Sequence, residues 1–464
     1  MRADRSRLPV IGPDPAFRFP AIVTHRLTNG LQVRTVEHHD LPVVTLVVQV
    51  EGGSSADPAD REGLAAIVAD MVDEGTGSMS ALDVSDALAR LGADYDVDVA
   101  PDVTTFSLTT LTRFASKGAT LLSDMVTRPT LRESDFARVR QLRLDRLKQI
   151  KDLPPAVAER AFLRLLYGRH PYGHVPLGNR SALERLTVDD VASFHRKTFH
   201  ASDSLVVVGG PMTHAELARL AEDAFGGWTH GPHRSFGESE PHQPTTWSTD
   251  QPAAPPGRRV AVIARESAAQ SELRIGQLSA PRNTPDYHSL VVMNAILGGQ
   301  FVSRVNLKLR EEKGYTYGAR TGFDWRRGLS PFVLQTSVHT ASTADAVQDS
   351  LSEIEGIRGA RPVSDRELTL AKASVTRGYP RNFETVQQVS RSLAQLALYG
   401  LPDTYFAEFV PKVNAVTADE VMRVATEYLD SERLTTLIVG DHSAIAESLS
   451  GVGLGAIDVL PAEW

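Results

Sequence analysis

An internal repeat restricts the fold of this chain more than any other feature of its sequence. Residues 183–210 read LERLTVDDVASFHRKTFHASDSLVVVGG, and residues 413–441 read VNAVTADEVMRVATEYLDSERLTTLIVGD. In each stretch a Thr (Thr187 or Thr417) precedes acidic residues, an amphipathic helical pattern and an apolar strand ending in Val-Gly. The offset is about 230 residues, half of the 464-residue chain. We therefore expect two similar halves rather than three unrelated domains.

A proline-rich stretch separates the two repeated parts. It has no apolar periodicity and contains Pro232, Pro241, Pro244, Pro252, Pro255 and Pro256. Such a composition is typical of an extended connection. We therefore predict an N-terminal half over residues 17–228, a linker over 229–257 and a C-terminal half over 258–445.

The first half predicts a mixture of strands and helices. Asn29-Gly30 lies between two alternating runs, which is a strong hairpin signal. Periodicity then predicts strands over 43–50 and 104–111 and helices over 63–72, 80–91, 116–125 and 133–150. The last helix has an apolar stripe of Phe136, Val139, Leu142, Leu147 and Ile150. Strands followed by runs of helices indicate the α+β class, not a doubly wound sheet.

Composition excludes several kinds of protein and site. The net charge of −8 and a pI near 6.0 argue against a general nucleic-acid-binding surface. The chain has no cysteine, which excludes disulfides and thiolate metal sites. No apolar run approaches the roughly 20 residues of a transmembrane helix, and the N-terminus lacks a signal-peptide core. We expect a cytoplasmic location, or a periplasmic one if a signal sequence was removed.

Four short motifs follow one another along the first half. They are Leu27-Thr-Asn-Gly-Leu31, GLAAIVADMVDEGT over 63–76, GADYDVDVAPDVTTF over 92–106, and His170-Pro-Tyr-Gly173. In this order they resemble the insulinase/pitrilysin-type (inverzincin) metallopeptidases, which include mitochondrial processing peptidase. The resemblance extends over nearly the whole chain. It implies two homologous α/β-roll halves, each with a mixed, largely antiparallel sheet covered by helices.

The resemblance places the family's zinc motif on residues 63–76, where its chemistry is missing. Catalytic members read G-x-x-H-x-x-E-H-M-x-x-x-G-T, with two His four residues apart on one helical face and a Glu as general base. Here Ala66, Ala69 and Asp70 stand at the His, Glu and His positions. Alanine offers no ligand, and a lone Asp70 cannot replace the roughly three protein ligands of catalytic zinc. We therefore expect no metal on this chain.

Other positions of the first half also differ from the family pattern. The third zinc ligand of the family, a Glu on the later long helix, aligns with Asp145 or Arg146. In the motif over 92–106, Asp96 replaces the family's Asn and Val99 replaces its Thr. The scaffold residues are kept while the residues that face the site have changed.

The second half keeps a feature that catalytic members use. Residues 297–317 read LGGQFVSRVNLKLREEKGYTY, close to the family pattern. The resemblance assigns Arg310 and Tyr317 to substrate contact near the scissile bond, since guanidinium and phenol can donate hydrogen bonds to peptide carbonyls. We expect Arg310 to end a helix, Gly314 to turn the chain and Tyr317 to begin a strand. Tyr315 would then share the face of Tyr317 and is the alternative tyrosine.

Plainer interpretations accompany these residues. Without its context Arg310 would be a surface charge, and Tyr317 a half-buried core aromatic. We interpret the pairs His38-His39 and His170/His174 as structural or solvent-facing, since Pro171 and Gly173 prevent a helix between the second pair. The basic residues Arg138, Arg140, Arg143, Arg146, Lys148 and Lys151 would form a solvated helix face or, alternatively, line a chamber for acidic peptide.

These observations favour a non-catalytic subunit of a heterodimeric zinc metallopeptidase. The expected partner is a homologous chain with the H-x-x-E-H motif and its zinc, and Arg310 and Tyr317 would complete the peptide site. One alternative is a purely structural or peptide-binding homologue, like the core proteins of a respiratory complex. A free-standing enzyme with a rewired metal site is the third hypothesis, and the sequence offers no second ligand cluster for it.

Overall fold

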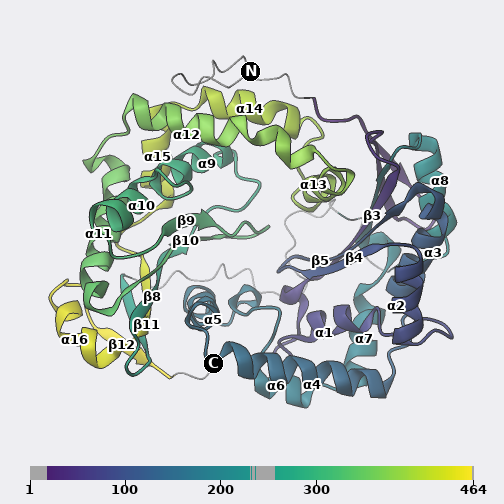
Figure 1. The fold of residues 1–464 in the computed structure, drawn as a ribbon, viewed down its shortest axis with the longest axis horizontal. Helices are drawn as coiled ribbons and strands as arrows, with labels where there is room; N and C mark the ends of the chain where they lie inside the picture. The colour runs from purple at the N-terminus through teal and green to yellow at the C-terminus, as the bar shows by residue number, and fades with distance from the viewer. Residues whose placement is uncertain (1–17, 230, 232–235, 237–256, 462–464) are drawn as a thin grey trace, which may run out of the picture.

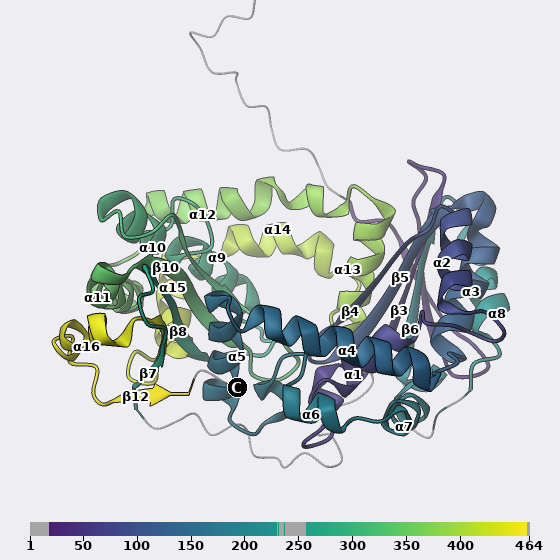
Figure 2. The same cartoon turned by 60° about the horizontal axis from the view of Figure 1, so that its bottom comes forward.

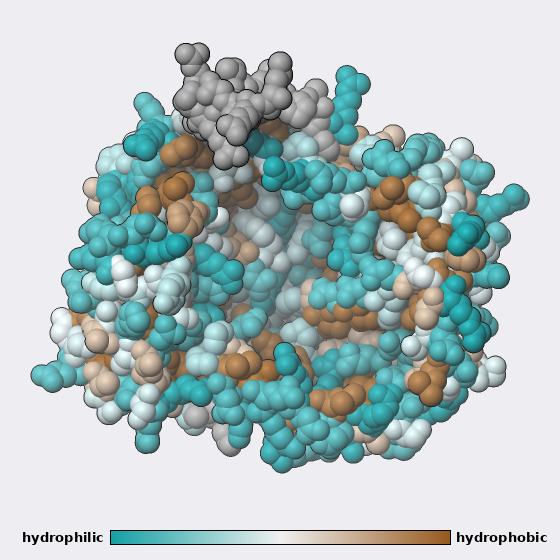
Figure 3. Space-filling view, viewed as in Figure 1, coloured by the Kyte–Doolittle hydropathy of each residue, from teal (hydrophilic) through white to brown (hydrophobic). Residues whose placement is uncertain are grey.

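The computed structural model describes residues 18–229, 231, 236 and 257–461, which form two six-stranded sheets. The first sheet has the order β1-β2-β6-β3-β5-β4, and the second has the order β12-β7-β11-β8-β10-β9. The two sheets lie on opposite sides of the molecule (Figure 1), and the space-filling view is hollowed between them (Figure 3). The strands are β1 Ile22–Arg26, β2 Gln32–Glu37, β3 Val43–Glu51, β4 Asp94–Val99, β5 Val103–Leu111, β6 Ser204–Gly210, β7 Arg259–Ala264, β8 Gln270–Leu278, β9 Ala319–Phe323, β10 Pro331–His339, β11 Thr435–Gly440 and β12 Ile457–Leu460.

Helices follow the strands in the same succession in both halves. Those of the first half are α1 Leu64–Met71, α2 Ala81–Arg90, α3 Ala115–Thr127, α4 Glu133–Ile150, α5 Pro154–Tyr167, α6 Arg180–Arg185, α7 Val188–Thr198 and α8 His214–Phe225. Those of the second are α9 Tyr287–Leu297, α10 Arg304–Asn306, α11 Thr343–Glu355, α12 Asp365–Arg377, α13 Val386–Leu398, α14 Tyr405–Ala415, α15 Ala418–Tyr428 and α16 His442–Ser450. The α+β class predicted from the sequence is confirmed.

The repeat is visible in the strand pairing. β6 is parallel to β2 and antiparallel to β3, and β11 is likewise parallel to β7 and antiparallel to β8. The helices before these strands begin with the same capping box, in which Thr187 accepts from the Asp190 amide and Thr417 from the Glu420 amide. The prediction of two homologous halves is therefore confirmed.

Each half lends one helix to the sheet of the other. The apolar face of α5 packs on β8 and β11, and its side chains share a buried cluster with Ala261, Ile263, Leu437 and Val439. In return α13 packs on β6 and β3, so closely that a Cβ at Gly209 would lie 2.5 Å from Ser390 Oγ. Figure 2 shows α5 beside the second sheet and α13 beside the first. Apolar burial of this kind contributes about 1.5–3 kcal/mol per large side chain, so the helix exchange binds the halves together.

The turn between β9 and β10 adds polar contacts across the halves. Arg326 is 2% exposed, donates from Nη1 to the Tyr172 carbonyl at 3.0 Å, and stacks over the ring of Tyr167. The neighbouring Arg327 donates from its amide to Asp102 Oδ2 at 3.0 Å and pairs with Glu51 at 2.7 Å. A buried guanidinium with these partners fixes the orientation of the second sheet relative to the first.

The predicted division into residues 17–228 and 258–445 stays a proposal, because the exchanged helices cross it. Most of the predicted linker over 229–257 lies outside the described residues. Within it, Phe236 is 2% exposed, joins a buried cluster formed by residues of both halves, and donates from its amide to the Ser202 carbonyl at 3.0 Å. The prediction for α4 is confirmed over Glu133–Ile150, but Leu142 is 59% exposed and does not belong to its buried stripe. Among the described residues no helix is both long and apolar enough to cross a membrane.

Candidate functional site

The helix that carries the degenerate zinc motif is held firmly in place. Asp57 is buried and accepts from the amides of Gly63 at 2.7 Å and Ala65 at 2.6 Å, at the start of α1. His174 Nε2 lies 3.0 Å from the same carboxylate. Desolvation raises the pKa of Asp57, while the bond to His174 opposes the shift. His174 is therefore a structural histidine, as the sequence indicated.

An arginine points at the motif positions where the family binds its metal. Arg143 of α4 donates from Nε to Asp70 Oδ2 at 2.6 Å and from Nη2 to the Ala66 carbonyl at 2.8 Å. Ala66 and Ala69 are buried and offer only methyl groups. A fixed guanidinium repels a divalent cation, so these residues do not fit zinc. Within the described part of the chain, no group of three or more His, Asp or Glu side chains could hold a metal.

The structure corrects one prediction about α4 and shows where the two residues aligned with the family's third ligand lie. Asp145 accepts from Lys148 and Gln141, Arg146 donates to Gln149, and neither of these two residues contacts the motif. Arg143, one turn earlier, is the residue that does. It was predicted to lie on a solvated basic face, yet its side chain is only 13% exposed. Its partner Asp70 stands at the second His position of the family motif. An acidic residue there, with an arginine on the later long helix, is the sequence signal that could have indicated this ion pair.

Acidic groups beyond Asp70 give this end of α1 a negative character. Burial and the nearby Glu74 raise the pKa of Asp73 to about 6. The hydroxyl of Tyr95 on β4 is buried without a hydrogen-bond partner among the described residues, and burial with Asp73 raises its pKa. On the same strand, Asp96 pairs with Arg391 of α13 at 2.8 Å. The first half thus presents carboxylates around its degenerate motif.

In the second half, Arg310 lies on a short irregular helix and Tyr317 on the loop that follows it. Residues Leu307–Glu312 form a π-helix, closed by a bond from the Lys313 amide to the Lys308 carbonyl. Such π-turns are frequent at functional sites. Gly314 turns the chain with φ of +66°, as predicted. The strand, however, begins at Ala319, since residues 315–318 form neither helix nor strand; Tyr317 therefore precedes the strand instead of starting it.

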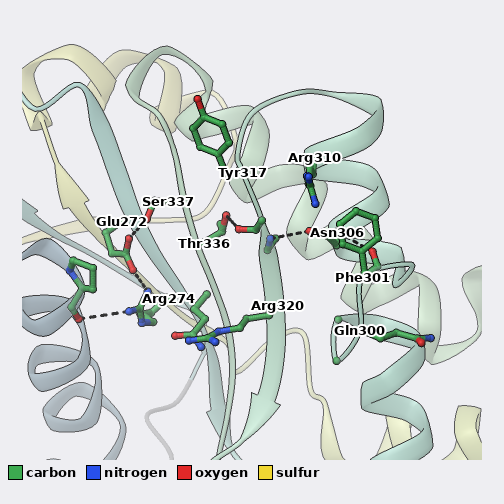
Figure 4. Close-up of a pocket in the computed structure, with 16 residues that line it drawn as sticks. Glu272, Arg274, Gln300, Phe301, Asn306, Arg310, Tyr317, Arg320, Thr336 and Ser337 are labelled. Atoms are coloured by element: carbon green, nitrogen blue, oxygen red, sulfur yellow. Dashed lines mark hydrogen bonds and ion pairs between the residues drawn. The ribbon is translucent and has the colours of Figure 1, made fainter. Parts of the chain in front are cut away.

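The two residues border one open cavity of about 560 Å³ on the inner face of the second sheet. Figure 4 shows Arg310 on the helix side, Tyr317 above it, and the strand residues Arg320, Arg274 and Glu272 across the cavity. The Arg310 guanidinium stacks at 4.6 Å over the Phe301 ring, and the Tyr317 side chain is 88% exposed. Tyr315 packs against the core of the half and is not part of the cavity wall.

A row of polar side chains crosses the floor of this cavity. In the strand register, Arg320 on β9 lies opposite Gln335 on β10, which lies opposite Arg274 on β8. With the Gln335 amide oxygen facing Arg320, it accepts from Nε at 2.5 Å and Nη2 at 2.9 Å. Arg274 pairs with Glu272, whose second oxygen accepts from Ser337. Sequence patterns did not indicate this row, because alternation along each strand does not define the register that brings the three strands together.

Comparison with known proteins gives the evolutionary relationship. Residues 32–178 match Insulinase (Peptidase family M16), and residues 185–375 match Peptidase M16 inactive domain. The chain belongs to the insulinase family, peptidase family M16. The matched ranges contain both the degenerate motif of α1 and the Arg310/Tyr317 loop. Lacking the zinc ligands and the general base, this chain is a non-catalytic member of the M16 family.

Individual M16 relatives are distant but nearly full-length. An uncharacterized zinc protease of Mycobacterium leprae is 23% identical over 437 residues, which cover 92% of this chain and 94% of the relative. A non-peptidase homolog of Helicobacter pylori, YmxG, is 21% identical over 427 residues, which cover 90% and 94%. The crystal structure of a peptidase M16 inactive domain from Pseudomonas fluorescens has a TM-score of 0.82 at 23% identity, covering 90% and 98%. These likenesses support the two-half fold.

Proposed function

We propose that this chain is the substrate-binding, non-catalytic subunit of a heterodimeric zinc metallopeptidase of the cytoplasm. Its partner is a homologous chain that carries H-x-x-E-H and holds the zinc ion. The observation that carries the proposal is the contrast between Arg310 with Tyr317, open to a cavity, and Arg143, which fills the metal position. A chain whose described residues offer no metal site, but which keeps Arg310 and Tyr317, fits a site divided between two subunits.

In this proposal Arg310 and Tyr317 bind an extended peptide. The Phe301 ring under the Arg310 guanidinium holds it at the rim of the cavity without neutralising its charge. Tyr317, with most of its side chain in solvent, can approach a bound peptide. Both donate hydrogen bonds to carbonyl oxygens of an extended peptide. Such a peptide can pair with the outer edge of β9, the last strand in its sheet order.

The test is hydrolysis of a quenched fluorescent peptide library. This chain, the H-x-x-E-H partner and their one-to-one mixture are assayed separately, with and without a metal chelator. We expect cleavage only by the mixture, abolished by the chelator. A partner that is equally active by itself, or zinc-dependent cleavage by this chain alone, would contradict the proposal.

A structural or peptide-binding role without peptidase activity is the second candidate. It is favoured by the Helicobacter pylori relative, which is named a non-peptidase homolog. Under this hypothesis no mixture cleaves, although labelled peptides still bind to the chain. Measuring binding by fluorescence anisotropy beside hydrolysis separates the two functions.

A further inference from the structure

Among the described residues, the wall of the cavity beside Arg310 has more arginines than carboxylates. Of its charged wall residues, three are arginines and one, Glu272, is acidic. Glu272 is already occupied by Arg274 and Ser337. The carboxylate nearest to Arg310 belongs to Glu311, its neighbour along the chain, at 3.5 Å and half exposed. Arg310 and Arg320 therefore remain as two cations without a buried counter-charge.

Of these two arginines, Arg320 gives the stronger evidence for a ligand site. Its guanidinium is held by the neutral amide of Gln335, which fixes its direction but not its charge. Among the residues that the structure describes, no carboxylate lies within 4.0 Å of Arg320. An arginine presented on a sheet face with its fork pre-oriented is well suited to bind a carboxylate.

At the matching position of the first half, the charged side chain has an ion-pair partner within the protein. Asp96 on edge strand β4 lies opposite Ser107, just as Arg320 on edge strand β9 lies opposite Gln335. Asp96 is paired with Arg391, which the exchanged helix α13 supplies. The charge at this position is thus reversed between the halves, and within the described parts of the chain only the first half supplies it with an oppositely charged partner.

We propose that Arg320, with Arg310, binds a carboxylate of an extended peptide that lies along β9. This proposal rests on the proposed function and names its substrate class: peptides that carry an acidic group. In a strand added to β9, the residue opposite Arg320 has its side chain on the same face, with Cβ atoms about 5 Å apart. A Glu or Asp there forms a charge-assisted pair, whereas a Lys there meets two guanidinium groups.

The test measures the affinity of the full chain for matched fluorescent peptides by anisotropy. The peptides are alike except for a central Glu, Gln or Lys, and each is made with a free and an amidated C-terminus. We expect the Glu peptide to bind about tenfold more tightly than the Gln peptide, and the Lys peptide to bind most weakly. The preference should weaken as salt is raised.

Two variants assign the preference to the cavity. Arg320→Gln removes the charge at an exposed edge position, and Arg366→Gln removes an equal charge from the exposed start of α12, outside the cavity. We expect Arg320→Gln to abolish the Glu preference and Arg366→Gln to retain it, with circular dichroism confirming that both are folded. If C-terminal amidation, rather than the Glu-to-Gln change, removes binding, the carboxylate comes from the chain end.

Other results overturn the inference. If Glu and Gln peptides bind equally while Arg310→Ala weakens both, peptide binding stands and the carboxylate preference is wrong. If Arg320→Gln and Arg366→Gln reduce the preference alike, the effect is general attraction and not a site. If no peptide binds at all, the proposed function fails and the inference falls with it.

Discussion

The two halves of this protein share a sheet order but differ in what they present to the hollow between them. In the first half, Arg143 pairs with Asp70 of the degenerate motif, and Asp96 pairs with Arg391 of α13. In the second, Arg310 and Tyr317 border an open cavity whose arginines exceed its carboxylates. The scaffold of a duplicated fold is thus retained by packing, while the residues facing the hollow are free to diverge.

We expect substitutions in the two halves to have effects of different kinds. Substitutions in the first half should alter stability, because its polar groups are bound to one another. Substitutions in the cavity of the second half should alter function, because its polar groups are accessible to a ligand. The following four variants test this division, from the largest expected effect to the smallest.

Arg310→Ala in the complex with the zinc-bearing partner is expected to lower kcat/KM by about 100-fold, since a hydrogen-bond donor at the reacting peptide is lost. Its guanidinium rests on the exposed Phe301 ring and its ion pair with Glu311 is also exposed, so folding and heterodimer formation should be unchanged. Steady-state hydrolysis with gel filtration checks both. An unchanged rate would remove Arg310 from the site, and dissociation of the complex would make it an interface residue.

Arg143→Ala is expected to lower the free energy of unfolding by about 2 kcal/mol, because Asp70 and the Ala66 carbonyl lose their donor. Urea denaturation measures the change. The double variant Arg143→Ala/Asp70→Ala should recover part of the loss by removing the unpaired carboxylate. Equal stability of wild type and Arg143→Ala would show that the pair does not connect α1 to α4.

Asp73→Asn is expected to raise stability at pH 7 by about 1 kcal/mol. The folded-state pKa of Asp73, about 6, lies above its ordinary value of 3.8 because of burial and nearby carboxylates. Folding is therefore opposed when this group is ionised, and wild-type stability should rise as pH falls from above 6 toward 4. Thermal melts across this range should be flatter for the variant, and the two proteins should converge below pH 4. A variant less stable at pH 7 would contradict the sign.

Arg391→Gln is expected to change stability least, by about 0.5 kcal/mol, because its ion pair with Asp96 is roughly half exposed on both sides. Peptide affinity at the cavity of the second half should not change. Urea titration and anisotropy measure the two quantities. A loss several times larger would mean that α13 depends on this pair, rather than on apolar contact, for its place on the first sheet.

Much of the fold could be predicted from the sequence because the strongest signals are local. The capping Thr187 and Thr417 marked the repeat, and Asn29-Gly30 marked the hairpin, with Gly30 at φ of +84°. The bounds of α4 were predicted correctly because its apolar periodicity lies within the helix itself. The degenerate motif was recognised for the same reason: three replaced residues within one short helix.

What the sequence did not predict depends on contacts between distant residues. The exchange of α5 and α13 cannot be read from either helix, because an amphipathic pattern does not say which sheet it will cover. Arg143 reaches Asp70 across 73 positions of sequence, and its charge alone suggested a solvated face. The row Arg320–Gln335–Arg274 exists only through the register of three strands, which sequence patterns leave undefined.

The exchanged helices also bear on how such a chain could have arisen. In a half-length ancestor, the counterpart of α5 or α13 would not pack on the sheet of its own chain. The apolar face of that sheet would then be exposed to solvent. Two copies, each lending a helix to the other, would cover both sheets, as in a domain-swapped dimer. Joining the copies into one gene would keep every contact and only raise the local concentration of the partner. Once the copies were covalently joined, each could mutate separately, and an Asp and an Arg could come to occupy what had been the same position.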